Sequence, residues 1–150
     1  MNDSDRCLML QREIPFRREL VWKAMTDPQH VNRWWGPDGF TNENVTMDFS
    51  VGGEWKYEMV GPDGTRYPNL VVFKEIEPPS RMVFDHGDWE RVWFETTVTL
   101  EETAGGTLVT LLQRYPDQAA RDEVVEKYGA IEGGKQHLAN LEAYIREHLS

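Results

Sequence analysis

Residues 130–149 read AIEGGKQHLANLEAYIREHL, and this stretch decides the fold class. Its apolar side chains recur at steps of three, four and seven residues, which places them in one stripe along a helix. The stripe consists of Ile131, Leu138, Leu141, Ile145 and Leu149, with the small Gly134 between them. Polar side chains occupy the opposite face, namely Glu132, Lys135, Gln136, Glu142, Arg146 and Glu147. A helix with one apolar face is half buried, so we expect it to cover another layer of structure.

The layer beneath this helix is predicted to be a β-sheet. Apolar and polar residues alternate along much of the preceding chain; Trp55, Tyr57 and Met59, for example, alternate with charged residues. Glycine and proline residues separate the segments, which predicts turns between them. We expect strands at residues 6–14, 41–49, 54–60, 67–76, 81–86, 92–100 and 107–113. Successive hairpins are typical of antiparallel sheets, so we predict an α+β fold whose six to seven strands wrap around the long C-terminal helix.

Three shorter helices are predicted outside the sheet. Residues 17–26 carry an apolar face, and Asp27-Pro28 stops that helix and starts a second one, because aspartate caps free amides and proline fits the first helical position. The second helix ends near Trp34-Trp35-Gly36-Pro37, where glycine and proline block its continuation. Asp117 is expected to cap a short helix through Lys127, which precedes the long one.

Size, charge and cysteine content restrict the classes of function. A chain of 150 residues is expected to form one domain, residues 1–150, in which the polar residues 1–5 are disordered. The 16 Lys and Arg against 26 Asp and Glu give a net charge of -10, which disfavours nucleic acid and anionic membranes as partners. No apolar run approaches the ~20 residues that span a bilayer, so no membrane insertion is expected. Cys7 is the single cysteine and no leader-like segment opens the sequence, which favours a reduced, cytoplasmic protein.

No motif points to a metal or a cofactor. The four histidines lack ligand spacing; they are His30, His86, His137 and His148. The glycine pairs Gly52-Gly53 and Gly133-Gly134 lack the residues that complete a phosphate-binding loop. The second pair still needs an explanation, because each glycine within a helix costs on the order of 1 kcal/mol relative to alanine. A close approach between helix and sheet, space left for a ligand, or a kink would each account for it.

Several stretches, taken in order along the chain, resemble a known superfamily. They are residues 14–24 (IPFRRELVWKA), 26–28 (TDP), 33–37 (RWWGP), 52–55 (GGEW) and 75–79 (EIEPP). Together they are similar to the SRPBCC, or START-like, superfamily, and within it to the branch of the C-terminal domain of the activator of Hsp90 ATPase. The resemblance implies a helix-grip fold, in which a curved antiparallel sheet holds a long C-terminal helix over a cavity and two short helices follow the first strand. Members of the superfamily include carriers of lipids and other apolar ligands, aromatic cyclases and chaperone activators.

The alternation predicts which side chains face the space between sheet and helix. The residues expected to contact a ligand are Trp34, Trp35, Phe40, Trp55, Tyr57, Met59, Tyr67, Asn69, Val71, Phe73, Phe84, Phe94, Gln113 and Leu138. The polar candidates on these faces are Asn69, Glu75, His86, Thr96 and Gln113. Such a lining suits a planar or greasy ligand, since small-molecule sites are mostly apolar with a few orienting polar groups. The same side chains would equally form a filled core, and both alternatives stay open.

Three functions follow as hypotheses. The first is a non-enzymatic binding module for a small hydrophobic or aromatic molecule. The second, which rests on the resemblance, is an interaction protein that contacts a chaperone and stimulates an Hsp90-type ATPase. The third is a cyclase-like enzyme in which His86, oriented by the adjacent Asp85, acts as a general base. An exposed strand edge or the Trp34-Trp35 corner could also pair two copies into a homodimer.

Overall fold

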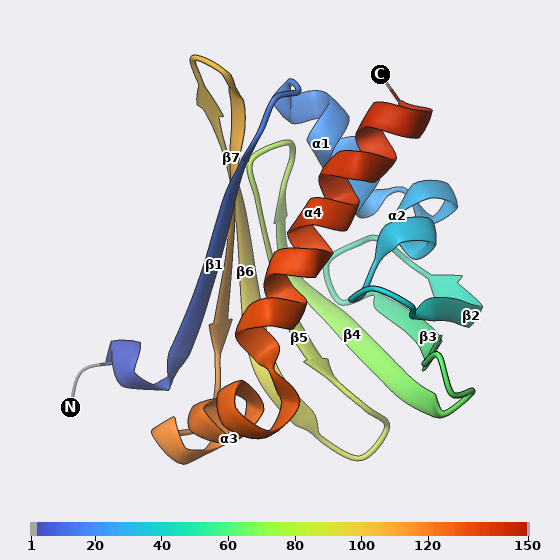
Figure 1. The fold of residues 1–150 in the computed structure, drawn as a ribbon, viewed down its shortest axis with the longest axis vertical. Helices are drawn as coiled ribbons and strands as arrows, with labels where there is room; N and C mark the ends of the chain where they lie inside the picture. The colour runs from blue at the N-terminus through green and yellow to red at the C-terminus, as the bar shows by residue number, and fades with distance from the viewer. Residues whose placement is uncertain (1–2, 150) are drawn as a thin grey trace.

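A computed structural model describes residues 3–149 (Figure 1). Within this range the chain forms one 3-10 helix, seven strands and four α-helices. In chain order they are η1 (Asp3–Arg6), β1 (Cys7–Ile14), α1 (Arg18–Thr26), α2 (Pro28–Trp34), β2 (Thr41–Met47), β3 (Glu54–Val60), β4 (Arg66–Glu77), β5 (Arg81–Gly87), β6 (Val92–Thr103), β7 (Gly106–Arg114), α3 (Gln118–Tyr128) and α4 (Ala130–His148). Of the stretch expected to be disordered, Met1 and Asn2 lie outside the described residues, whereas Asp3 begins η1.

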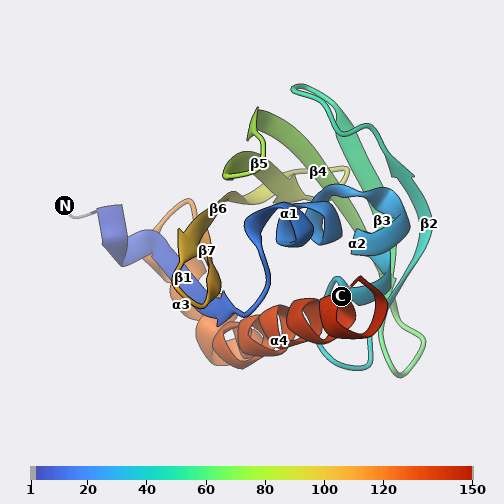
Figure 2. The ribbon, with the colours of Figure 1, turned by 90° about the horizontal axis from the view of Figure 1, so that it is seen from above.

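The strands form one curved antiparallel sheet in the order β1-β7-β6-β5-β4-β3-β2. Figure 2 shows the sheet as an arc, with α4 on its open side and with α1 and α2 between α4 and the β3–β5 part of the arc. The prediction of an α+β helix-grip fold, with two short helices after the first strand, is therefore confirmed. Among residues 3–149, no helix combines the length and the apolar character that crossing a membrane requires.

The predicted helix boundaries have the predicted physical cause. The Asp27 carboxylate accepts a hydrogen bond from the Gln29 amide at 2.9 Å, and Pro28 occupies the first position of α2. Asp117 caps α3 in the same way, through the Ala120 amide at 2.8 Å. Gly129 joins α3 to α4 with a φ of 62°, a left-handed conformation that glycine adopts without steric cost.

The apolar stripe of α4 packs onto the core over most of its length. Leu138, Leu141 and Ile145 are each at most 2% exposed, as predicted. The prediction is wrong for Ile131, which is 41% exposed. The first turn of α4 lies beside α3 (Figure 1), and α3 carries no buried residue, so no packed layer covers Ile131 at that end.

The polar face of α4 is also less uniform than predicted. Glu142 was expected to be solvated, but its side chain is only 15% exposed and its carboxylate lies 3.0 Å from Nε of Arg12 on β1. This ion pair explains how Arg12 fits among the buried Leu8, Leu10 and Ile14 of the same strand. The two nearby guanidinium groups, Arg12 and Arg146, hold the pKa of Glu142 below its usual value against the opposing effect of burial.

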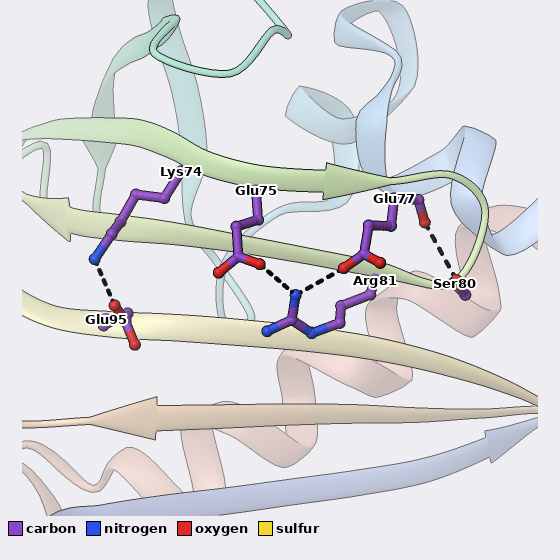
Figure 3. A network of polar contacts seen from close by, with 6 residues as sticks. All are labelled: Lys74, Glu75, Glu77, Ser80, Arg81 and Glu95. Atoms are coloured by element: carbon purple, nitrogen blue, oxygen red, sulfur yellow. Dashed lines mark hydrogen bonds and ion pairs between the residues drawn. The ribbon is translucent and has the colours of Figure 1, made fainter.

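A β-bulge moves one predicted inward residue to the outer face of the sheet. The pairing register between β4 and β5 shifts between Phe73 and Glu75, so that Glu75 points outward and the partly buried Ile76 packs against the core instead. On the outer face, Arg81 Nη1 lies 2.8 Å from the Glu75 carboxylate and 2.7 Å from that of Glu77 (Figure 3). The expectation that Glu75 faces the interior is therefore wrong.

Candidate ligand-binding cavity

A cavity of about 280 Å³ lies between the concave side of the sheet and the N-terminal half of α4. The sheet contributes residues from β1, β3, β5, β6 and β7, and the remaining walls come from the segment after α2, from Tyr115 after β7, and from the α3–α4 junction and α4. The lining consists of Leu10, Trp35, Gly36, Pro37, Met59, Phe84, His86, Phe94, Thr96, Leu111, Gln113, Tyr115, Tyr128, Gly129, Ala130, Gly133, Gly134 and His137. Tyr128 is 67% exposed, so the cavity meets solvent beside the α3–α4 junction.

The cavity brings together only part of the set predicted from the sequence. Those that line it are Trp35, Met59, Phe84, Phe94 and Gln113, together with the catalytic candidate His86. The other predicted contacts lie outside the lining: Trp34, Phe40, Trp55, Tyr57, Tyr67, Asn69, Val71, Phe73 and Leu138. Most of these are buried in the adjoining core, but Tyr67 is 46% exposed. A filled core and a cavity therefore both occur, in different parts of the same sheet.

Side-chain size explains why one part of the interior is filled and the other is hollow. Beneath α2, the ring of Trp55 packs 4.9 Å from that of Trp35 and 4.6 Å from that of Tyr57, measured between centroids. On β6 and β7 the concave face instead carries the smaller Thr96 and Leu111. The helix that faces these two strands contributes Gly133 at the same place, so the opposing surfaces do not meet there.

The two glycines of α4 serve different purposes. A Cβ atom at Gly134 would overlap Leu10 Cδ1 on β1, so this glycine permits the close approach of helix and sheet. A Cβ atom at Gly133 would meet nothing within 4 Å, and Gly133 lines the cavity. The explanation by close approach therefore applies to Gly134, whereas Gly133 borders open space.

His86 is held at one ring nitrogen. The amide of Asn69 is oriented by its hydrogen bond to the Tyr67 carbonyl (2.9 Å), which turns Asn69 Oδ1 toward His86 Nε2 at 2.7 Å. Nε2 therefore carries the proton and donates it, and Nδ1 is an acceptor without a partner in residues 3–149. Burial lowers the pKa of His86 to about 4, so the ring is neutral near pH 7.

Asp85 does not orient His86, contrary to the catalytic hypothesis. Neighbouring residues on a strand point to opposite faces of the sheet, and the Asp85 carboxylate lies 3.6 Å from Lys74 Nζ on the outer side. The side-chain amide of Asn69, and not the Asp85 carboxylate, forms the hydrogen bond that orients His86. The Tyr57 hydroxyl, which accepts a 2.8 Å hydrogen bond from Trp35 Nε1, lies 3.3 Å from the same ring nitrogen.

His137 on α4 is the second imidazole of the cavity. Its Nδ1 accepts a hydrogen bond from the Gly36 amide at 3.1 Å, so Nε2 carries the proton and is a donor without a partner in the described residues. Burial, and secondarily the proximity of His86, lowers the pKa of His137 to about 3. From the sequence, we considered this histidine only as a possible metal ligand. His137 follows Gly133 by four residues, which places both on one face of a helix. This spacing could have identified His137 as a cavity residue.

Thr96 and Gln113 face each other as a cross-strand pair on the floor of the cavity. Thr96 is 3% exposed, and its buried hydroxyl has no hydrogen-bond partner within residues 3–149. Gln113 Oε1 accepts a hydrogen bond from the Tyr115 hydroxyl at 2.9 Å, which leaves its Nε2 group unused. Burial raises the pKa of Tyr115 to about 12, so this hydroxyl stays protonated as a donor.

The cavity lining contains no Asp, Glu, Lys or Arg. Within residues 3–149, no group of three or more His, Cys, Asp or Glu side chains is arranged to hold a metal ion. The arrangement is thus apolar and aromatic, and besides the tyrosine hydroxyls it carries four polar side chains, His86, Thr96, Gln113 and His137, that are neutral near pH 7. It can enclose a molecule and orient it by hydrogen bonds.

Solved structures similar to this chain come from several bacteria. A protein from Nitrosomonas europaea has a TM-score of 0.89 at 25% sequence identity, with 97% of each chain covered. A protein from Arthrobacter aurescens has a TM-score of 0.85 at 28% identity, and the similarity covers 100% of this chain and 91% of that one. An AHSA1-like protein from Aeromonas hydrophila shares the fold at 22% identity, with a TM-score of 0.73 over 94% of this chain and 92% of its own.

No curated protein has a significant match to this chain. The sequence model of one family does match, over residues 15–146, and the family is described as "Activator of Hsp90 ATPase homolog 1-like protein". This range begins directly after β1 and runs almost to the end of α4, so it includes every lining residue of the cavity except Leu10. The chain therefore belongs to the activator of Hsp90 ATPase homolog 1-like family.

Proposed function

We propose that the protein binds a small, mainly apolar or aromatic molecule in the cavity between the sheet and α4. The observation that carries this proposal is a hollow of about 280 Å³ whose lining includes several aromatic rings and the unpartnered hydroxyl of Thr96. Small-molecule sites typically measure roughly 300–1,000 Å³ and combine an apolar lining with a few polar groups. The volume of about 280 Å³ lies just below that range, which favours a compact molecule of one or two rings.

The buried hydroxyl of Thr96 supports the same proposal, because it lines the cavity and no described residue bonds to it. A buried hydroxyl without a partner costs about 1–3 kcal/mol. A ligand that accepts or donates a hydrogen bond would give this hydroxyl a partner.

Binding is favoured over general-base catalysis by the state of His86. A general base works best when its pKa lies near the working pH. Burial lowers the pKa of His86 to about 4, so near pH 7 the ring is a weak base, although it remains a good hydrogen-bond acceptor. Stimulation of an Hsp90-type ATPase is the alternative that the family description suggests, and an ATPase assay with the purified protein in excess tests it.

The test of the proposal fills the cavity from the helix side. Gly133→Leu introduces a branched side chain where a Cβ meets nothing within 4 Å, whereas Lys135→Leu places the same side chain on the exposed face of α4. Native mass spectrometry of freshly purified protein is compared with the denatured sample, and affinity for an apolar fluorescent probe is measured in parallel. We expect retained mass or probe binding in the wild type and in Lys135→Leu, and its loss in folded Gly133→Leu. Equal probe affinity in all three proteins would refute the proposal.

A further inference from the structure

We propose that the cavity selects uncharged carbonyl compounds, such as aryl ketones or quinones of one or two rings, over carboxylates of the same shape. This inference rests on the proposed function, since it names the chemical class of the molecule that the same site would take.

Three polar side chains of the cavity are each held by a hydrogen bond at one atom, while a second polar atom has no bond to a described residue. His86 is held by Asn69, His137 by the Gly36 amide, and Gln113 by Tyr115. The anchors fix which atoms remain. They are Nδ1 of His86, Nε2–H of His137 and the Nε2 group of Gln113, and no described residue uses them.

Among these atoms, hydrogen-bond donors outnumber acceptors. His137 offers one N–H and Gln113 offers two, whereas the only atom restricted to accepting is Nδ1 of His86. The Thr96 hydroxyl can act as a donor or as an acceptor. Because it is buried without a partner in the described residues, a hydrogen bond from a ligand would stabilise it more than it would an exposed group. The site therefore offers more donors than acceptors, which suits a ligand whose polar atom is a carbonyl oxygen.

The lining of the cavity carries no charged side chain near pH 7. None of its residues is Lys or Arg, and burial keeps both histidines neutral near pH 7, so no cation is available to pair with a buried carboxylate. Moving an unpaired carboxylate out of water is far more costly than moving a neutral carbonyl group. The net charge of -10 on the chain also repels anions over longer distances.

Three naphthalenes of similar shape test the inference: 2-acetonaphthone, 2-naphthoate and 2-ethylnaphthalene. Their affinities are measured at pH 7.5 by quenching of tryptophan fluorescence and by calorimetry. We expect 2-naphthoate to bind at least about tenfold more weakly than the ketone, because its charge is buried without a partner. We expect 2-ethylnaphthalene, which lacks the oxygen, to bind about three- to tenfold more weakly than the ketone.

A matched pair of threonine variants assigns the preference to the cavity. Thr96→Val removes the unpartnered hydroxyl at the site, whereas Thr103→Val removes another buried, unpartnered hydroxyl of β6 that lies outside the lining. We expect the ratio of ketone to ethylnaphthalene affinity to fall in Thr96→Val and to stay at the wild-type value in Thr103→Val. Gln113→Leu is a second variant that should lower the same ratio.

The possible failures are distinguishable. If 2-naphthoate binds as tightly as the ketone or more tightly, and Gly133→Leu abolishes that binding, this inference is overturned while the proposed function stands. If both threonine variants change the ratio of ketone to ethylnaphthalene affinity equally, the hydroxyl of Thr96 does not hydrogen-bond to the carbonyl group, and the inference is again overturned. If none of the three compounds binds, the proposed function itself fails for compact two-ring molecules.

Discussion

Replacing Gly134 by alanine should destabilise the fold, whereas the same replacement at Gly133 should stabilise it. The two residues are adjacent in α4, so each substitution gains a similar helix-propensity term of roughly 0.5–1 kcal/mol. They differ in what the new methyl group meets. At Gly133 the added Cβ has nothing within 4 Å, and the full propensity gain of roughly 0.5–1 kcal/mol should appear as stability.

At Gly134 the methyl group meets the buried Leu10. The added Cβ would overlap Leu10 Cδ1 and come within 3.0 Å of Cδ2 and 3.1 Å of Cγ, so the whole side chain must move rather than its tip. Leu10 is 7% exposed and belongs to the core, and overpacking a core in this way costs roughly 1–3 kcal/mol. After the propensity gain, Gly134→Ala should range from about neutral to about 2.5 kcal/mol less stable than the wild type.

Urea unfolding followed by tryptophan fluorescence measures both variants. The helix-propensity term cancels in their difference, so Gly133→Ala should exceed Gly134→Ala in unfolding free energy by roughly 1–3 kcal/mol, which is the overpacking term alone. A double-mutant cycle with Leu10→Ala supplies the control, since the cost at Gly134 should largely disappear when the opposing side chain is truncated. Equal stabilities of the two alanine variants, or an undiminished cost in the Leu10→Ala background, would refute the reasoning.

Two further predictions concern pH and helix capping. The ordinary pKa of histidine is 6.5 and that of His86 is about 4, so between these values the unfolded chain binds a proton that the folded chain does not. Protonation of His86 alone should lower stability by on the order of 3 kcal/mol as the pH drops through this window, and His137, whose pKa is about 3, adds a loss of the same sign. The total fall should therefore be smaller in His86→Gln than in the wild type, and parallel pH profiles of the two proteins in urea unfolding would contradict this. Asp27→Ala should lower global stability by about 1 kcal/mol, because α2 contributes the buried Val31 and Trp34 to the core. Asp117→Ala should instead speed amide exchange in α3 with little global effect, since α3 has no buried residue; equal global losses in the two variants would argue against this.

The order and type of the elements could be predicted because they depend on residues close together in the chain. The stripe that includes Leu138 and Leu141 and the alternation of Trp55 with Tyr57 each express one local period. The start of α2 depends on two adjacent residues, one of which supplies an acceptor and the other a fixed φ. Such signals do not require knowledge of any partner surface.

The direction of individual side chains was predicted less well, because it depends on bulges and on neighbouring elements that the local periodicity does not reveal. One bulge in β4 moved Glu75 to the outer face, because a shift of one residue reverses which face a strand residue occupies. Ile131 follows the helical period but is exposed, and Glu142 lies on the polar face but is largely covered by its ion pair with Arg12. In each case the outcome depends on which neighbour the tertiary fold supplies.

The sequence by itself determined the order of strands and helices and an aromatic interior, because hydrophobic periodicity and turn residues act locally, and the family resemblance added the helix-grip arrangement. Only the tertiary structure decided where that interior is filled and where it is hollow. The large rings beneath α2 pack together, whereas Thr96 and Leu111 on the paired strands β6 and β7 leave a gap beneath Gly133 of α4. Which ring nitrogens of His86 and His137 remain unused was likewise decided by the tertiary structure, because Asn69 and the Gly36 amide, which bond to the other nitrogens, lie on other segments of the chain.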